Sequence, residues 1–137
     1  MSAALTGGCE CGAIRYQRSA EPIMAGHCHC RSCQKASGTG HASHLMVPKA
    51  ATTTTGEAAF YERGADSGNT VRRAFCPTCG SPVWGESSGF PDVVVLRVGS
   101  LDDPERFRPG AVVYAANAPD WDHMDPALPS FPKMPER

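Results

Sequence analysis

The chain has 137 residues, a formal net charge of −1 at pH 7, and no basic cluster denser than Arg72-Arg73. A nucleic-acid-binding protein usually presents a basic face, so this charge balance argues against a nucleic-acid partner. No apolar run approaches the roughly 18 residues of a membrane-spanning helix, and residues 1–9 lack the features of a signal peptide. We therefore expect one cytoplasmic domain over residues 1–137, with no membrane partner.

The 14 glycines and 12 prolines predict many turns and short elements. A short helix or turn is expected at 31–36, ended by Gly38, and an irregular tail packed on the domain is expected from Asn117 onward. The consecutive valines of 93–98 indicate a strand buried on both faces. A mainly β fold follows, with strands at 13–18, 23–30, 41–47, 52–55, 58–62, 69–75, 82–86, 93–98 and 112–115.

Seven cysteines are present, an odd number that cannot be fully paired. Disulfides are rare in the reducing cytosol, so metal ligation is the better explanation. Cys9 and Cys11 form one close pair, and Cys76 and Cys79, followed by Gly80, form another. Four thiolates would make the closed tetrahedral shell typical of structural zinc. The two pairs lie ~65 residues apart, so a shared ion would close a long loop and stabilise the fold.

The alternatives for this first group are a redox Cys-x-x-Cys at Cys76 and Cys79, or buried free thiols. A thioredoxin-like redox motif would require a βαβ setting, and the predicted strands show no such alternation.

The second group is Cys28, Cys30 and Cys33. On a strand Cys28 and Cys30 share one face, and Cys33 follows one turn later. Three protein ligands with one open position are typical of catalytic zinc. Three thiolates leave the zinc complex negatively charged and weaken it as a Lewis acid. Such a metal suits the binding of an incoming thiol as thiolate, the reactive form of sulfur.

A closed second site is the alternative, with a histidine as the fourth ligand. Strand alternation directs His27 and His29 away from the cysteines, whereas His41 or His44 could close the shell from the next strand. A site without metal, or one that holds iron, also remains open.

The cysteine motifs and the C-terminal pattern resemble those of the glutathione-dependent formaldehyde-activating enzyme family, which also contains the centromere protein V proteins. The resemblance covers nearly the whole chain. The motifs that carry it are Gly8-Cys9-x-Cys11-Gly12-x-x-Arg15-Tyr16, Cys28-His29-Cys30-x-x-Cys33-Gln34, Phe75-Cys76-x-x-Cys79-Gly80 with Trp84, Gly99-Ser100-Leu101-Asp102-Asp103-Pro104, Ala118-Pro119-Asp120-Trp121, and Leu128-Pro129 with Phe131.

This resemblance implies the β-tent zinc fold, built from small antiparallel sheets. It also implies a structural zinc on the four-cysteine group and a catalytic zinc on the three-cysteine group, or two Zn²⁺ ions per chain. The family's named activity joins glutathione to formaldehyde, giving S-(hydroxymethyl)glutathione, and is classed as a carbon–sulfur lyase in reverse.

We therefore predict a zinc-dependent carbon–sulfur lyase that acts on glutathione or another small thiol and on an aldehyde such as formaldehyde. His29 and His44 are the candidate proton-transfer side chains. The alternatives are a non-catalytic zinc-stabilised binding domain with two closed metal sites, or a thiol or zinc sensor. The candidates for binding the charged groups of glutathione, if they are not simply surface charges, are Arg31, Lys35, Arg72, Arg73 and Arg97.

Overall fold

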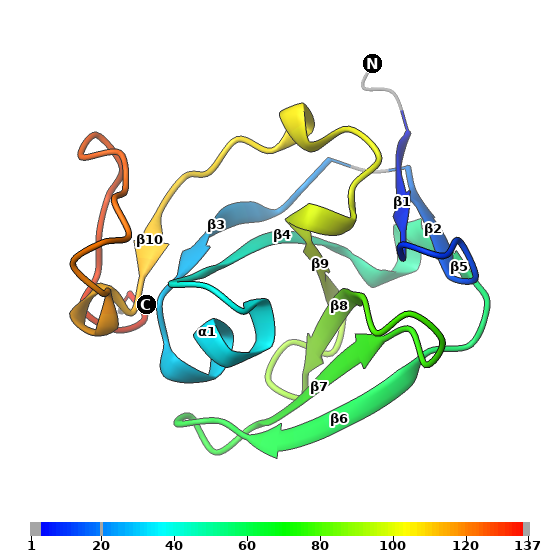
Figure 1. The fold of residues 1–137 in the computed structure, drawn as a ribbon, viewed down its shortest axis with the longest axis horizontal. Coiled ribbons are helices and arrows are strands. Elements are labelled where there is room, and N and C mark those ends of the chain that lie inside the picture. The colour runs from blue at the N-terminus through cyan, green and yellow to red at the C-terminus, as the bar shows by residue number, and fades with distance from the viewer. Residues whose placement is uncertain (1–3, 20, 136–137) are drawn as a thin grey trace.

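The computed structural model describes residues 4–19 and 21–135 and contains two β-sheets (Figure 1). The smaller sheet is antiparallel, in the order β1 (Leu5–Gly8), β2 (Arg15–Arg18), β5 (Thr52–Thr55). The larger sheet has the order β10 (Val112–Val113), β3 (Met24–Cys28), β4 (Ala42–Pro48), β9 (Val93–Arg97), β8 (Pro82–Ser87), β7 (Thr70–Phe75), β6 (Ala59–Gly64). Its neighbouring strands are antiparallel except β10 and β3, which are parallel.

The prediction of a mainly β fold is confirmed, and each predicted strand overlaps an observed one. Strand β1 was missed. Its sequence, Leu-Thr-Gly-Gly, contains two glycines and carries little β propensity. Pairing with β2 and burial of Leu5, which is 3% exposed, stabilise it instead. Tertiary contacts, and not local sequence preference, therefore stabilise this strand.

The predicted strand 23–30 is shorter in the structure, because β3 ends at Cys28 and the chain then turns into the helix α1 (Arg31–Ser37). Cys30 is the N-cap of α1, and Gly38 ends the helix with a left-handed φ of 80°. Figure 1 shows α1 in the connection between β3 and β4, beside the strands of the larger sheet. None of the helices in the described residues has both the length and the apolar character needed to cross a bilayer.

The prediction that the strand at 93–98 is buried on both faces is wrong, because only one face of β9 is buried in the core. Val94 and Leu96 are buried in the core, whereas Val95 and Arg97 are only partly buried and line a cavity. The apolar run concealed this difference, since Val95 is apolar although it faces a cavity. The main core also contains Cys9 and Cys76, together with Leu5, Ile14, Tyr16, Leu45, Val47, Val83, Val94, Leu96, Val98 and Leu101.

The segment after β10 folds back along that strand, as the prediction of a packed, irregular tail requires. Val112 N–H donates to Pro129 O at 2.8 Å, and Phe131 N–H donates to Val112 O at 2.9 Å. Gln34 Nε2 of α1 donates to Asn117 O at 3.1 Å. These contacts hold the tail beside α1 and bring it to the same part of the molecule as the three-cysteine group.

Candidate metal centres

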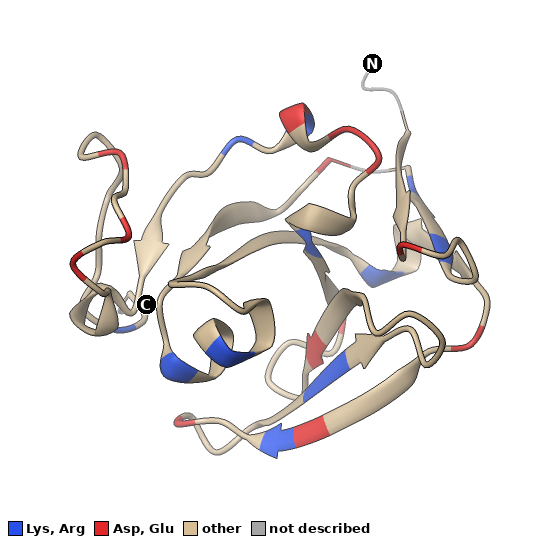
Figure 2. Cartoon of the chain, viewed as in Figure 1, with Lys and Arg blue, Asp and Glu red and all other residues tan. Residues whose placement is uncertain are grey.

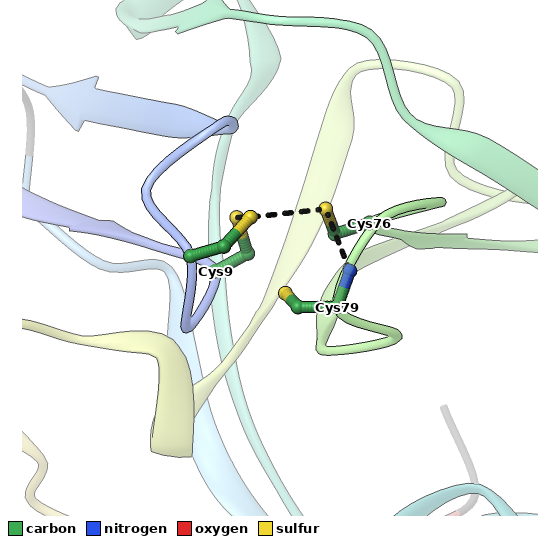
Figure 3. Close-up of side chains that lie close together, drawn as sticks. Cys9, Cys76 and Cys79 are labelled. Carbon is green, nitrogen blue, oxygen red and sulfur yellow. Dashed lines mark hydrogen bonds between the residues drawn. The ribbon is translucent and has the colours of Figure 1, made fainter.

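The four sulfurs of Cys9, Cys11, Cys76 and Cys79 lie within 4.8 Å of one another. The Cys9–Cys11 and Cys11–Cys76 sulfur distances are both 3.7 Å (Figure 3). A tetrahedral zinc ion with Zn–S bonds near 2.3 Å places its sulfurs about 3.8 Å apart. Both sulfur–sulfur distances therefore match the edge of a zinc–thiolate tetrahedron, and the group can hold a zinc ion.

Backbone N–H groups support these sulfurs. Ile14 N–H donates to Cys9 Sγ at 3.2 Å, and Cys79 N–H donates to Cys76 Sγ at 3.5 Å. Hydrogen bonding by Ser81 lowers the pKa of Cys79 to about 5. Hydrogen bonds of this kind favour the charged thiolate, which is the form that binds metal.

The three sulfurs of Cys28, Cys30 and Cys33 also lie within 4.8 Å of one another. Cys28 comes from the end of β3, and Cys33 N–H donates to Cys30 Sγ at 3.2 Å in the first turn of α1. Hydrogen bonds from Cys28 and then Cys33 lower the pKa of Cys30 to about 2. The strand-to-helix turn therefore brings three thiols together, and this group can also hold a metal ion.

No histidine or carboxylate of the described residues joins this second group of ligand atoms. His29 is fully buried, and its Nδ1 donates to Gly40 O at 2.8 Å. His27 Nδ1 lies 2.8 Å from Ser43 Oγ, and His41 Nδ1 lies 2.6 Å from Asp122 Oδ2. One nitrogen of each of these rings is therefore engaged with another partner, while Nε2 of His29 is buried without a hydrogen-bond partner.

His44 has a different partner. Its Nε2 lies 2.7 Å from Nη1 of Arg97. A guanidinium can only donate, so Nε2 must accept and the ring proton must be on Nδ1. Desolvation of the ring and the charge of Arg97 lower the pKa of His44 to about 3. His44 is therefore neutral at pH 7, and its Nε2 lone pair is occupied.

A cavity of about 530 Å³ adjoins the three-cysteine group and is lined by Cys30 and Cys33. One face of the larger sheet forms a wall of this cavity, because alternate residues of each strand point to the same side. Arg73 of β7 is opposite Gly85 of β8, and Gly85 is opposite Val95 of β9. Gly85 has no side chain and thus leaves space between the neighbouring strands.

The cavity is rich in basic side chains. Two acidic residues, Asp66 and Glu86, also line it, and Glu86 is already paired with Lys49, at 2.8 Å from Nζ to Oε1. Figure 2 shows basic positions on α1, on β7 and at the end of β9, around this region. The basic residues that line the cavity are Arg31, Arg63, Arg73, Arg97 and Lys133. This charge suits an anionic ligand.

Five basic residues were predicted from the sequence as candidates for binding glutathione, and the structure places only some of them at the cavity. Arg31, Arg73 and Arg97 line the cavity, whereas Lys35 and Arg72 do not. Arg72 instead stacks over the ring of Phe60, at 4.0 Å from its centroid, and pairs with Glu62. Sequence position alone did not separate these groups, because Arg72 and Arg73 are neighbours that point to opposite faces of β7.

Tyr114 is a cavity residue that the sequence analysis missed. It packs against the three-cysteine group, and its φ of 54° is the one positive value among the non-glycine residues that the structure describes. Such a backbone is costly for a tyrosine and is held in place by surrounding structure. Tyr114 N–H donates to Lys133 O at 3.2 Å, so the returning tail sets its conformation. No local sequence signal marks this contact.

A mainly β fold with one four-cysteine and one three-cysteine group defines a protein with two candidate transition-metal centres, one of them beside a basic cavity. Residues 4–117 match the model of the glutathione-dependent formaldehyde-activating enzyme family, and the chain belongs to this family. The motif resemblance that the sequence showed is thereby confirmed.

Two relatives extend this result. A protein of Halomonas elongata, provisionally named as a glutathione-dependent formaldehyde-activating enzyme, is 29% identical over 132 residues, which cover 85% of this chain and 78% of that protein. A crystal structure of a Rhodobacter sphaeroides protein matches with a TM-score of 0.59 and 16% identity, over 92% of this chain and 98% of that one. The second similarity supports the fold alone.

Proposed function

We propose that the protein is a zinc-dependent carbon–sulfur lyase of the S-(hydroxymethyl)glutathione synthase type, which joins glutathione or another small thiol to an aldehyde such as formaldehyde. The observation that carries the proposal is the three-cysteine group at a cavity, with no fourth ligand from the described residues. The family membership and the name of the Halomonas relative support the choice of thiol and aldehyde.

The two cysteine groups have different roles in this proposal. Cys9, Cys11, Cys76 and Cys79 would saturate a structural zinc, which stabilises the fold by joining the turn after β1 to the turn after β7. Cys28, Cys30 and Cys33 would hold a second zinc with one position left for substrate. When bound there, zinc would supply the substrate thiol as a reactive thiolate at neutral pH.

The cavity residues would bind and orient the substrates. A volume of about 530 Å³ lies within the usual range for small-molecule sites, and the basic lining would hold carboxylates. In the reaction the substrate thiol loses its proton, and the thiolate sulfur forms a bond to the carbonyl carbon as the carbonyl π bond breaks. The resulting alkoxide oxygen takes up a proton, so the product differs from thiol and aldehyde only in how the same atoms are bonded. Of the two histidines considered for this proton transfer, His44 lines the cavity and His29 does not.

The closed-site alternative requires a fourth protein ligand at the second centre, and the described residues bring none to it. We also retain the cytoplasm as the proposed location, because both groups need reduced thiols to bind metal and the cytosol keeps thiols reduced.

The test uses the zinc-loaded full chain. Thiol–formaldehyde adducts also form without a catalyst, so the readout is the NMR exchange rate between glutathione and its adduct at equilibrium, above background. We expect the wild type to raise this rate. Cys30→Ser should bring it back to background while the four-cysteine zinc and the fold remain. A wild-type protein with two bound zinc ions and no rate above background would show that the proposed activity is wrong.

A further inference from the structure

Two arginines lie on the same face of the larger sheet, on either side of β8. Arg73 is on β7 and Arg97 is on β9, and both line the cavity with Cys30 and Cys33. A methyl group at Gly85 would lie 4.0 Å from Nη2 of Arg97. The guanidinium of Arg97 therefore extends over β8 at its glycine, toward the side of Arg73.

Neither arginine forms an ion pair with a carboxylate among the described residues, where the arginine and lysine ion pairs involve Arg15, Lys49 and Arg72. Arg73 Nη2 donates to Ser32 Oγ at 2.7 Å, and Arg97 Nη1 donates to His44. The Nε atoms of Arg73 and Arg97 are buried without a hydrogen-bond partner.

Charges that are removed from water need compensation by nearby opposite charges. Asp66 and Glu86 also line the cavity, but among the described residues neither forms an ion pair with either arginine. The cysteine sulfurs are the other candidates, because both arginines line the same cavity as Cys30 and Cys33. Arg73 bonds to the residue that precedes Cys33 on α1. The two arginines thus face the three-cysteine group and lack acidic partners of their own.

The expected charge of the metal centre indicates what effect the two arginines would have on ligand binding. Zinc with three thiolates carries one net negative charge, and a fourth thiolate would add a second. Bringing an anion to an anionic complex is unfavourable inside a cavity of low dielectric. Two guanidinium groups would compensate the charge of the four-thiolate complex, whereas a neutral ligand such as water gains much less from them.

We propose that Arg73 and Arg97 are positioning residues that make the three-cysteine centre select a thiolate as its fourth ligand over a neutral ligand. This inference rests on the proposed function, because it assumes a metal ion on Cys28, Cys30 and Cys33. It differs from carboxylate recognition: the two arginines act on the sulfur itself, so they should strengthen the binding of thiols that carry no carboxylate at all.

The test measures ligand binding to the cobalt-substituted full chain, whose absorption spectrum reports the coordination of the metal. The probes are 2-mercaptoethanol, a thiol without a carboxylate, and imidazole, a neutral ligand. We expect Arg73→Gln and Arg97→Gln each to weaken 2-mercaptoethanol binding about tenfold or more, with little change for imidazole. Arg97→Lys should recover part of the loss. Arg72→Gln is the matched control, since it removes the neighbouring charge that points away from the cavity, and it should change neither affinity.

Equal 2-mercaptoethanol affinity in the wild type and both Gln variants would overturn the proposal. Loss of the second cobalt ion in both Arg97→Gln and Arg97→Lys would also overturn it, because the arginine would then hold the cysteines together. The proposed enzyme activity is judged separately. A wild type that binds the thiol in this selective way but does not accelerate aldehyde exchange would refute the activity and leave the role of the arginines intact.

Discussion

His44 and Arg97 are directly paired in the register of β4 and β9, and their side chains meet at 2.7 Å between Nε2 and Nη1. Burial of the ring, together with this contact, keeps the imidazole neutral by lowering its pKa, and the contact occupies Nε2 of His44. It also places a guanidinium at the wall of the cavity beside the three cysteines. This one hydrogen bond between β4 and β9 thus affects both the set of available metal ligands and the charge of the cavity.

The pH dependence of folding should report the environment of His44. Its pKa is about 3 in the folded chain, against an ordinary value of 6.5 for histidine. Between these values the unfolded chain binds the proton and the folded chain does not. Stability is therefore present above pH 6.5 and is lost as the pH falls, at up to about 1.4 kcal/mol per pH unit.

Chemical denaturation of the wild type and His44→Asn between pH 5 and pH 8 would measure this dependence. We expect a flatter profile for the variant. The exposed His123 provides a control, because His123→Gln should leave the wild-type slope unchanged. Identical slopes for the wild type and His44→Asn would contradict the assignment.

The two cysteine groups should respond differently to the loss of one ligand. Cys76 is completely buried in the core, so Cys76→Ser should lower Tm by more than about 10 °C as the structural metal is lost. Cys30→Ser should remove one metal ion per chain and leave most of the thermal stability. Metal analysis and thermal denaturation would measure both effects, and an equal loss of Tm would show that both groups are structural.

Filling the cavity at Gly85 should block the site without unfolding the chain. A Cβ at this position would lie 3.5 Å from Arg72 O, which is ordinary van der Waals contact. We therefore expect Gly85→Ala to be tolerated, whereas the longer side chain of Gly85→Leu would extend between Arg73 and Arg97. Thiol binding to the cobalt-substituted protein should weaken about tenfold or more in the Leu variant, which is roughly 1.4 kcal/mol. Normal binding in Gly85→Leu would argue against this cavity as the ligand site.

The contact between the end of β5 and the turn before β2 should depend on Gly56. This residue has a φ of 88°, and a Cβ would lie 2.0 Å from Ala13 O. Gly56→Ala should therefore destabilise the fold by about 2 kcal/mol or more. Gly68 has a φ of 87° and open space around it, so Gly68→Ala should cost only about 1 kcal/mol. Denaturant titration of both variants would test the difference, and equal costs would show that the close approach to Ala13 is not limiting.

The features of the fold and the site that could be predicted from the sequence depend on residues that lie close together along the chain. Cys28, Cys30 and Cys33 belong to one short segment, so a strand followed by a turn is enough to bring their sulfurs together. The Cys-x-x-Cys of Cys76 and Cys79 is equally local. Most strands were also predictable, since alternation and turn residues are local signals. Strand β1 was not, because its glycines hide a strand that exists through pairing with β2.

Residue types at short spacing were enough to predict the mainly β character of the chain, the membership of the two cysteine groups and the family. Three contacts could be seen in the folded chain alone: Arg97 meets His44, Arg73 and Arg97 line one cavity from which Arg72 is absent, and the returning tail places Tyr114 beside the cysteines. The physical reason is that these contacts depend on the lateral order and register of strands far apart in sequence. That order follows from which faces are buried together, and hydrophobic periodicity does not encode it.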